Sequence, residues 1–452
     1  MRIIIVGCGK VGSTITQELS MEGHDVTVID TDNVVVQSVS NSHDVMGIVG
    51  NGASYGVQME AGIEEADMLI AVTDSDELNL LCCLIAKKAG DCSTIARVRD
   101  PIYNNEVNFI KEELGLSMTI NPEYAAATEI SRILRFPPAI EIDTFAKGKV
   151  ELTKYYIGAD SILCNRTLIE VSNVYKSDIL VCAVERDDNV FIPKGNFMLK
   201  ENDMISIVGS PANVASFFKK LGVEISQVKN TMIVGGGTIA FYLASQLLTM
   251  GIEVKIIEED RKRCEELSEI LPEAVIINAD ATNQDVLLEE GIDYVESFVS
   301  LTGIDEANIF LSLFAKSRSK GKIVTKINKI SFDGIINSFN LGSLIYPKFT
   351  TAENITQYVR AAQNTIGSNV EVLYKIIESK AEALEFAVRE VSDVVGVPLE
   401  SLKIKDNILI ASINHKGRVI TPKGKNIISV GDSVIVVTTS PGLKDITDIL
   451  KN

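Results

Sequence analysis

A glycine-rich turn near the N-terminus constrains this chain more than any other feature. Gly7, Gly9 and Gly12 form a G-x-G-x-x-G turn between an apolar run at residues 2–6 and a stretch with helical periodicity. A second apolar run, DVTVID, ends in Asp30. Strand, glycine turn, helix and terminal acidic residue together are the fingerprint of a dinucleotide-binding unit. Open amides at the helix start favour a phosphate anion. We therefore predict a nucleotide site in which Asp30 accepts from a ribose hydroxyl and disfavours NADP. The alternative is a purely structural turn.

The turn occurs twice, because nearly the whole chain is an internal duplication. The segment MIVGGGTIAFYLASQLLTMGIEVKIIE repeats the first unit and ends in an acidic residue of its own. Repeats of this length decide the architecture of a chain. The aligned pairs are Gly7 and Gly235, Gly9 and Gly237, Gly12 and Ala240, Asp30 and Glu258, Thr73 and Thr302, Glu77 and Glu306, Arg97 and Lys326, Pro193 and Pro422, and Asp203 and Asp432.

Each repeat has a larger first part and a smaller second part. In repeat one we expect strands near residues 3–6, 26–30, 45–49, 68–72, 94–98 and 117–120, alternating with amphipathic helices. Such alternation predicts an α/β fold with a doubly wound, parallel, Rossmann-like sheet. A crossover helix over residues 123–135 should end at Pro137-Pro138. A small α+β part follows, with a short helix at 168–172 and a hairpin around Asp187-Asp188. We predict four domains, at 1–138, 139–224, 225–367 and 368–452.

Polar residues follow two of the expected strands, where ligands lie in open α/β sheets. Asp74 and Glu77, three residues apart, suggest a capping box for the next helix, and Thr73 and Glu77 could also contact a ligand. Arg97 and Arg99 close the fifth strand and could share one phosphate group, although a surface salt bridge is an equal alternative. Repeat two has Lys326 and Asn328 at these positions, so we expect its phosphate binding to be weaker.

Composition excludes some classes of protein. The chain carries 61 acidic and 43 basic residues, a net charge of −18. Nucleic-acid binding and docking on bare anionic lipid both need a basic face, so neither is expected. The seven cysteines include no C-x-x-C pair and suggest buried apolar residues in a reducing cytosol. We expect no signal peptide, because the first strand starts at once, and no apolar run reaches the length of a membrane span.

Candidate acid–base and metal-binding residues are scarce. A dehydrogenase needs a proton-transfer group beside the nicotinamide, usually histidine. The three histidines, His24, His43 and His415, are all expected in exposed loops. No Ser/His/Asp, Cys/His or metal constellation is recognisable in the sequence, so we expect neither catalytic nor metal-ligating residues.

The tandem nucleotide folds, the PKG-containing small domains, the TDSDELN run and NPEYAAATEISRILRFP together resemble a known family. This is the TrkA family of Trk-type potassium uptake systems, whose units are called RCK or KTN domains. The resemblance runs end to end and implies the order RCK-N, RCK-C, RCK-N, RCK-C (TrkA-C). It implies a cytoplasmic, non-enzymatic regulatory subunit, peripheral at the inner face of the membrane. The implied partner is a potassium-translocating subunit of the TrkH or TrkG type, and the chains would form a homotetrameric ring.

The resemblance also implies ligands and site residues. NAD(H), and also ATP or ADP, would bind the lobes and change the shape of the ring. Asn51 stands where the family often has aspartate, and Ala240 replaces the third glycine of the second turn. The implied residues of site one are Gly7, Gly9, Lys10, Val11, Gly12, Asp30, Thr73, Glu77 and Arg97, and Asn51 and Arg99 are further candidates for this site. Those of site two are Gly235, Gly237, Thr238, Ile239, Glu258, Asp280, Thr302, Glu306 and Lys326.

Two other functions stay open from the sequence. The main alternative is an NAD-dependent oxidoreductase. The two fingerprints occur without a recognisable acid or base, which argues against this alternative. A weaker one is a sensor whose small-molecule site lies in the PKG-containing domains. The sequence does not decide which nucleotide each lobe takes, or whether the chain activates or inhibits transport.

Overall fold

The computed structural model describes the 452-residue chain except residues 188, 224, 329–338, 340, 365–369, 377–379, 441 and 452. The chain forms two compact units, each built from both repeats. Unit 1 comprises Met1–Ser131 and Lys229–Thr356, and unit 2 comprises Arg132–Val228 and Gln357–Asn452. Unit 1 therefore contains both glycine turns, and unit 2 contains both small domains.

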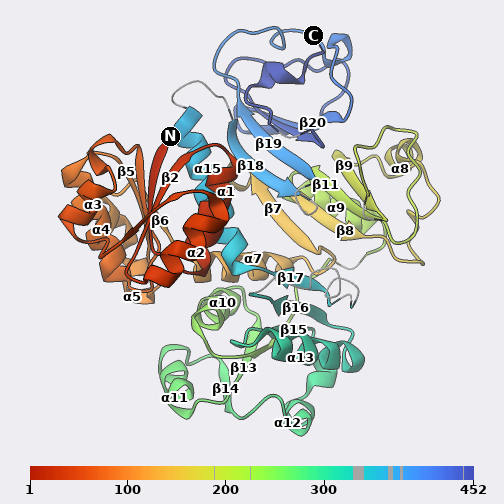
Figure 1. The fold of residues 1–452 in the computed structure, drawn as a ribbon. Helices are drawn as coiled ribbons and strands as arrows, with labels where there is room; N and C mark the ends of the chain where they lie inside the picture. Colours follow the sequence, from red (N-terminus) through yellow and green to blue (C-terminus); the bar gives the residue numbers. More distant parts are fainter. Residues whose placement is uncertain are drawn as a thin grey trace. The chain divides into compact units, whose positions relative to one another are not determined.

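The first lobe of unit 1 is a parallel six-stranded sheet with the order β3-β2-β1-β4-β5-β6 (Figure 1, red to orange). Its central strands are buried runs of Ile, Val and Leu, as expected where helices cover both faces of a sheet. The strands are β1 (Arg2–Val6), β2 (Asp25–Asp30), β3 (Met46–Val49), β4 (Met68–Ala71), β5 (Ser93–Arg97) and β6 (Met118–Ile120). The helices are α1 (Lys10–Met21), α2 (Asn33–His43), α3 (Tyr55–Glu60), α4 (Asp76–Ala89), α5 (Pro101–Asn105), α6 (Val107–Leu114) and α7 (Pro122–Arg135), with the 3-10 turn η1 (Ile63–Glu65).

The second lobe repeats this order as β14-β13-β12-β15-β16-β17 (Figure 1, green to teal). Its strands are β12 (Asn230–Val234), β13 (Glu253–Glu258), β14 (Val275–Asn278), β15 (Ser297–Ser300), β16 (Lys322–Lys326) and β17 (Ser343–Ile345). Its helices are α10 (Thr238–Thr249), α11 (Arg261–Ile270), α12 (Gln284–Glu289), α13 (Asp305–Arg318) and α15 (Pro347–Asn364), with η3 (Ile292–Tyr294). The six strands expected in repeat one are confirmed to within one or two residues, and so are the doubly wound sheets.

Inside unit 1 the two lobes exchange contacts through their crossover helices. Helix α7 of the first lobe packs on α10 of the second, where the rings of Tyr124 and Tyr242 meet edge to face with centroids 5.3 Å apart. Gln246 Nε2 donates to Thr128 Oγ1 at 3.1 Å across the same contact. Reciprocally, α15 contacts α1, since Thr356 Oγ1 donates to Glu18 Oε2 at 3.1 Å. Each lobe is therefore completed by a helix from the other repeat.

Unit 2 contains two antiparallel five-stranded sheets, ordered β10-β9-β11-β8-β7 and β18-β19-β22-β20-β21. Both contribute small buried residues such as Cys182, Ala183, Ala383 and Ala411 to one apolar cluster. The first domain has β7 (Glu141–Phe145), β8 (Val150–Tyr156), β9 (Ile179–Arg186), β10 (Asn189–Phe191), β11 (Met204–Gly209), α8 (Leu168–Tyr175), α9 (Pro211–Lys220) and η2 (Ala146–Gly148). The second has β18 (Val370–Ile376), β19 (Ala381–Ala387), β20 (Ile408–His415), β21 (Arg418–Ile420), β22 (Ser433–Thr438), η4 (Leu399–Ser401) and η5 (Ile446–Ile449).

The second small domain departs from a strict copy of the first. Where the first domain has α8 and α9, the second has the short turns η4 and η5. Before η5, Gly442 has φ +93°, a backbone conformation outside a regular helix. Two predicted domain boundaries, at 224/225 and 367/368, and Asp188 of the predicted hairpin lie outside the described residues.

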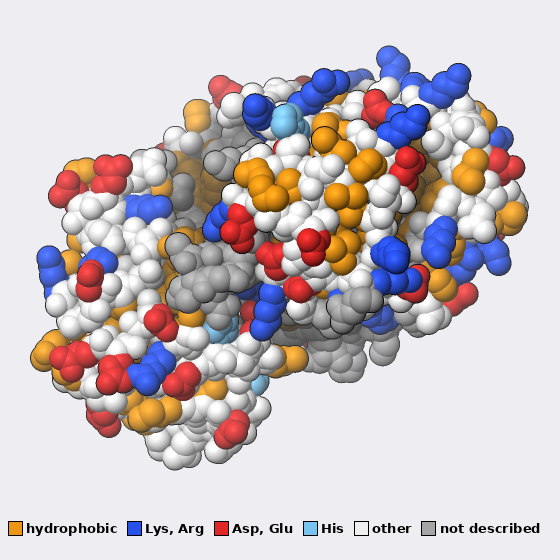
Figure 2. Space-filling view, turned by 90° about the horizontal axis from the view of Figure 1, so that it is seen from above, with side chains coloured by type: hydrophobic (Ala, Val, Ile, Leu, Met, Phe, Trp, Pro, Cys, Tyr) orange, Lys and Arg blue, Asp and Glu red, His pale blue; other side chains and the backbone are white. Residues whose placement is uncertain are grey.

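Two surface observations complete the fold. Within the described part of the chain, none of the helices is both long enough and apolar enough to cross a membrane. On the face shown in Figure 2, lysine and arginine side chains lie interspersed with acidic and apolar ones.

Candidate functional site

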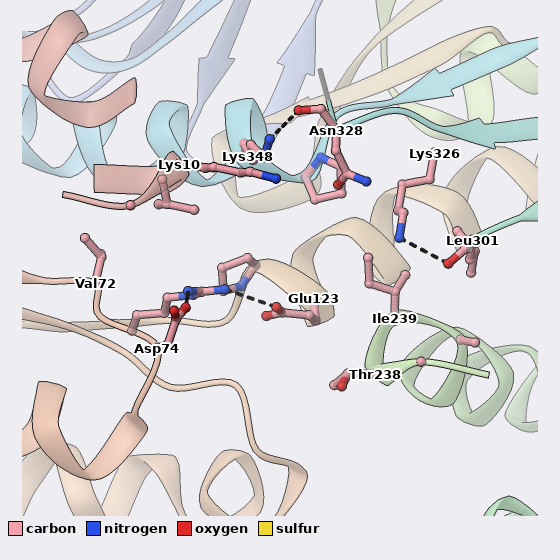
Figure 3. Close-up of a pocket in the computed structure, with 17 residues that line it drawn as sticks. Lys10, Val72, Asp74, Glu123, Thr238, Ile239, Leu301, Lys326, Asn328 and Lys348 are labelled. Atoms are coloured by element: carbon pink, nitrogen blue, oxygen red, sulfur yellow. Dashed lines mark hydrogen bonds and ion pairs between the residues drawn. The ribbon is translucent and has the colours of Figure 1, made fainter. Parts of the chain in front are cut away.

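The two glycine turns of unit 1 open onto one shared cavity of about 530 Å³ (Figure 3). Residues of both repeats line it in matching pairs: Gly9 and Gly237, Lys10 and Thr238, Val11 and Ile239, Val72 and Leu301, Arg97 and Lys326, Pro122 and Pro347, and Glu123 and Lys348, together with Asp74, Ala240 and Asn328. The pairing follows from the duplication, because the carboxyl ends of both sheets face the same space.

Four helices begin at this cavity. Lys10, Pro122, Thr238 and Pro347 are the first residues of α1, α7, α10 and α15, and all four line it. The first amides of a helix have no partner within the helix, and its dipole places partial positive charge at that end. Pro122 and Pro347 have no amide hydrogen, and Tyr124 N of α7 donates to Asn121 Oδ1 at 2.8 Å. Helices α1 and α10 have no side-chain cap, so their first amides face the cavity without a capping partner, and all four dipoles favour an anion there.

The charged side chains of the cavity add to this potential. Lys10, Arg97, Lys326 and Lys348 contribute positive charge, whereas Asp74 and Glu123 are the acidic residues of the lining. The chain as a whole has a net charge of −18. A cationic cavity in an acidic protein is a local concentration of charge that attracts anionic ligands.

Arg97 is the most constrained of these cations. Arg97 is only 8% exposed. Its Nη2 donates to Glu123 Oε1 at 3.2 Å, and its Nη1 lies 3.8 Å from Asp74 Oδ1. Its buried Nε and the buried Glu123 Oε2 have no hydrogen-bond partner. The guanidinium lines the cavity wall, and its terminal nitrogens carry more N–H donors than these two carboxylate contacts use, so the group can bind a phosphate oxygen.

The cation of the second lobe sits differently. Lys326 Nζ donates to Leu301 O at 3.1 Å (Figure 3). Burial lowers the pKa of Lys326, while Asp305 and Glu123 act in the opposite direction. Lys348 Nζ donates to the backbone carbonyl of Asn328. The second lobe therefore presents two lysines where the first presents an arginine and a glutamate.

The glycine turns are built as the fingerprint requires. Gly7 and Gly235 have φ of +98° and +97°, and a Cβ on Gly7 would lie 2.9 Å from Thr73 N. A side chain at Gly7 would therefore collide with the neighbouring strand end. A Cβ on Gly9 or Gly237 would meet no atom within 4 Å, so the backbone there faces open space where a phosphate group fits.

The acidic residues at the ends of β2 and β13 bind the turns themselves. Asp30 Oδ2 accepts from Cys8 N at 2.7 Å, and its Oδ1 accepts from Asp32 N at 3.0 Å. Glu258 likewise accepts from Gly236 N at 2.5 Å. Each carboxylate oxygen keeps a second lone pair, so the same group can accept from a ribose hydroxyl. Burial, followed by the nearby Asp30, raises the pKa of the Cys8 thiol to about 12, so this thiol in the turn stays protonated.

Asn51 and Asp280 follow β3 and β14, next to these carboxylates. Asn51 Oδ1 accepts from Ala53 N at 2.9 Å. Asp280 Oδ1 accepts from the hydroxyl and the amide of Thr282, which lowers the pKa of Asp280. Both residues close equivalent turns at the edge of the sheets, away from the cavity lining.

Thr73 and Thr302 lie behind the cavity and are fixed by two buried asparagines. Asn79 Oδ1 accepts from Thr73 N at 2.8 Å and from its Oγ1 at 2.7 Å, while Nδ2 donates to Arg97 O at 3.0 Å. Asn308 makes the same bonds to Thr302 and Lys326. These asparagines join the ends of β4 and β5, and of β15 and β16, and so place the cation of each lobe. Sequence reasoning did not assign them a role, although the repeat of Asn79 at Asn308 was visible.

Several sequence expectations need correction. The cap of α4 is Ser75, whose Oγ accepts from Leu78 N at 3.2 Å, and not Asp74. Glu77 instead accepts from Ser75 Oγ and Tyr103 OH; these bonds, after one from its own backbone amide, lower its pKa. Glu306 is at the equivalent place at the start of α13.

Arg99 lies beyond the end of β5 and is not part of the cavity lining, so it does not share the position of Arg97. Its Nη2 donates to Asp74 O, and its Nε lies 3.8 Å from Asp76 Oδ1. The histidines also differ from expectation. His24 is buried at 7% exposure, and His415 ends β20 in an ion pair. His43 is the half-buried last residue of α2.

The cavity also contains residues that sequence reasoning missed. Pro122, Glu123, Pro347 and Lys348 begin the crossover helices, directly after the last strand of each sheet. Their place after a strand end was a usable signal. In the described part of the chain, His, Cys, Asp and Glu form no group of three or more that could bind a metal ion.

Comparison with known proteins agrees with this architecture. The TrkA-N domain matches residues 3–122 and 231–347, and the TrkA-C domain matches residues 152–222 and 383–451. The chain belongs to the TrkA family. A Trk system potassium uptake protein TrkA homolog 1 of Methanosarcina mazei is 30% identical over the full length of both chains. A Trk system potassium uptake protein TrkA of Haemophilus influenzae is 29% identical, covering 96% of this chain and 95% of its own.

Solved structures share the fold. The GsuK RCK domain has a TM-score of 0.63 and 17% identity, with 97% of this chain and 92% of that chain covered. A GsuK channel bound to NAD also has a TM-score of 0.63 at 17% identity, with 97% and 77% covered. These two structures share the fold of this chain over nearly its whole length.

Proposed function

We propose that this chain is a nucleotide-binding regulatory subunit of a potassium uptake system. The observation that supports this most is the shared cavity, where four helix starts and four cationic side chains from both repeats converge. The TrkA relatives are named for potassium uptake, and the GsuK structures of the same fold were solved with NAD and with ADP. We infer that adenine nucleotides place their phosphates in the cavity.

In each site, one group of residues would bind the adenosine end of the ligand and another group its phosphates. In site one, Asp30 and Asn51 would hold the adenosine end, and Gly9, Lys10, Val11 and Arg97 would contact phosphates. In site two, Glu258 and Asp280 correspond to the first pair, and Gly237, Thr238, Ile239 and Lys326 to the second group. Four residues would support the walls of the cavity: Thr73, Glu77, Thr302 and Glu306. The conformation of the glycine turns would depend on Gly7, Gly12 and Gly235. Arg99 would act only through its contacts with Asp74 and Asp76.

The geometry also suggests how nucleotide binding in the cavity could change the conformation of the chain. Phosphates in the cavity would touch the first residues of α7 and α15, the two crossover helices that continue out of unit 1. A ligand shifts a conformational equilibrium only by its different affinity for the two states. We propose that nucleotides of different charge set different angles between neighbouring lobes, which these helices transmit, with coupling of about 1–3 kcal/mol.

The proposed partner is a membrane potassium-translocating subunit of the TrkH or TrkG type, contacted at the inner face of the cell membrane. We further propose that the chain is not an enzyme and that it assembles as a homotetrameric ring with the domain limits predicted from the sequence. Exposed apolar side chains on α4 of the first lobe and on the equivalent helix α13 of the second lobe support self-association. Leu81 of α4 is 46% exposed, Phe310 of α13 is 70% exposed, and Ile304, the N-cap of α13, is 62% exposed.

Copurification tests the partnership. A detergent extract with the tagged membrane subunit should retain this chain, and ATP, ADP and NADH should change the retained amount to different extents. Retention of equal amounts in every nucleotide state, with binding shown separately, would contradict a regulatory role.

A further inference from the structure

The second small domain contains a contact between a histidine and a carboxylate that lies outside the nucleotide site. His415 Nδ1 at the end of β20 lies 2.5 Å from Asp432 Oδ1. The Asp432 side chain is only 2% exposed, whereas that of His415 is 41% exposed. Asp432 Oδ2 also accepts from Ser429 N at 2.8 Å. The carboxylate therefore connects the end of β20 with the loop 421–432, which carries the PKG sequence and returns the chain to β22.

The first small domain has the same connection with a different cation. Arg186 ends β9, as His415 ends β20, and Asp203 corresponds to Asp432. Arg186 Nε and Nη2 donate to the two oxygens of Asp203 at 2.6 and 2.7 Å, and Nη2 also donates to Met198 O. Asp203 accepts from Lys200 N at 2.7 Å, like Asp432 from Ser429. The duplication has thus produced two copies of one contact, in which a cationic or imidazole side chain at a strand end binds an aspartate that holds the following loop. We call this contact the clamp.

The two cations respond differently to pH. Arginine is always protonated in proteins, so the clamp of the first domain keeps its charge. Histidine changes charge between about pH 5 and 8. A protonated imidazole adds the attraction between two charges to its hydrogen bond with the carboxylate, whereas a neutral imidazole keeps the hydrogen bond alone. We propose that His415 and Asp432 form a pH-sensitive clamp on the loop 421–432, closed when the imidazole is protonated and loosened when it is neutral.

Charged groups of both signs surround His415. Asp432 contacts the ring, and the carboxylate of Glu385 accepts from Ser433 Oγ, next to Asp432 in the chain. Arg418 lies opposite His415 on β21, and Lys416 follows it in the chain. From the first small domain, Lys149 Nζ lies 2.7 Å from where a Cβ on Gly417 would be. Among these groups, Asp432 is the one in direct contact with the imidazole, so it is the partner that closes the clamp.

Hydrogen exchange of the full chain tests the clamp with an internal control. Exchange is measured at about pH 5.5 and about pH 8, each relative to the intrinsic rate at that pH. Protection of 421–432 should fall about three- to tenfold at the higher pH, because the attraction between the two charges is lost and only the hydrogen bond remains. Protection of 192–203, with its arginine clamp, should not change. An equal fall in both segments would overturn the proposal.

Two substitutions exchange the cations. His415→Arg should remove the pH dependence of 421–432, and Arg186→His should create one in 192–203. A pH dependence that persists unchanged in His415→Arg would overturn the proposal. If either variant fails to fold, hydrogen exchange of Asp432→Asn at the two pH values decides. The segment 421–432 should lose its pH dependence in this variant, and a pH dependence that persists unchanged would refute the clamp.

Discussion

Replacement of Arg97 by methionine is the sharpest perturbation of the proposed phosphate site. Methionine keeps most of the side-chain length but removes the charge and all donors. Arg97 Nη2 lies 3.2 Å from Glu123 Oε1, and the Glu123 side chain is only 17% exposed. The substitution therefore removes one cation from the cavity and also leaves a partly buried carboxylate without its partner.

Both effects weaken the binding of an anion. A hydrogen bond to a charged group contributes about 1.5–3 kcal/mol. At an effective dielectric constant of about 20, a carboxylate about 5 Å from a phosphate charge opposes it by about 3 kcal/mol, before solvent and salt reduce it. We expect a net loss of about 2–3 kcal/mol, which weakens ATP binding about 30- to 150-fold.

Isothermal titration calorimetry of the full chain at fixed salt measures this loss. Arg99→Met is the matched control, because Arg99 is two residues away and outside the cavity lining; its ATP affinity should stay within about threefold of the unmodified chain. The double variant Arg97→Met with Glu123→Gln should recover affinity to within about tenfold, since the unpaired carboxylate is gone. Equal affinities of Arg97→Met and Arg99→Met would refute the phosphate site.

Three further predictions address recognition, chemistry and motion. Asp30→Ala should weaken adenine-nucleotide binding by about 1–3 kcal/mol in calorimetry, with Asp25→Ala, at an exposed position at the start of β2, as control. It should reduce ATP binding more than Glu258→Ala does, because site one has the arginine, and equal losses would contradict this ranking. NAD(H) should not turn over with hydroxy acids, aldehydes or amino acids, since no acid–base group was recognised for it; a steady change in nicotinamide absorbance would revive the oxidoreductase alternative. Spin labels at Glu60→Cys and Glu289→Cys should report different distances with ATP and with ADP or NADH, whereas identical distributions despite binding would exclude the proposed movement of the lobes.

The sequence predicts those parts of the fold that depend on neighbours in the chain. Buried runs of Ile and Val, two glycine turns and the acidic residues after them are local patterns, and they placed the sheets and turns correctly. The histidines show where this reasoning fails. His24 follows Gly23 in a polar turn, yet the fold brings its ring to 3.5 Å from the N-terminal amine and buries it.

The shared cavity was not predictable in the same way. Its walls come from residues more than 200 positions apart, and they meet only because α7 packs on α10 and α15 contacts α1. Tyr242 illustrates this, since its hydroxyl donates to Arg99 O at 2.9 Å and accepts from Asn121 at 3.0 Å across the two lobes. Nothing in the local sequence of α10 indicates those partners. Separately expressed repeats would lose these contacts, so the full chain is the proper subject of binding experiments.

Potassium flux through the membrane partner tests the central claim most directly. The membrane subunit is reconstituted in vesicles, alone or with this chain, and potassium flux is recorded without nucleotide and with ATP, ADP or NADH. The account predicts that flux changes with the nucleotide only when the chain is present, and that Arg97→Met shifts the ATP response to about 30- to 150-fold higher concentration while Arg99→Met does not. A flux that is the same in every nucleotide state, with the complex intact and ATP bound, would contradict it.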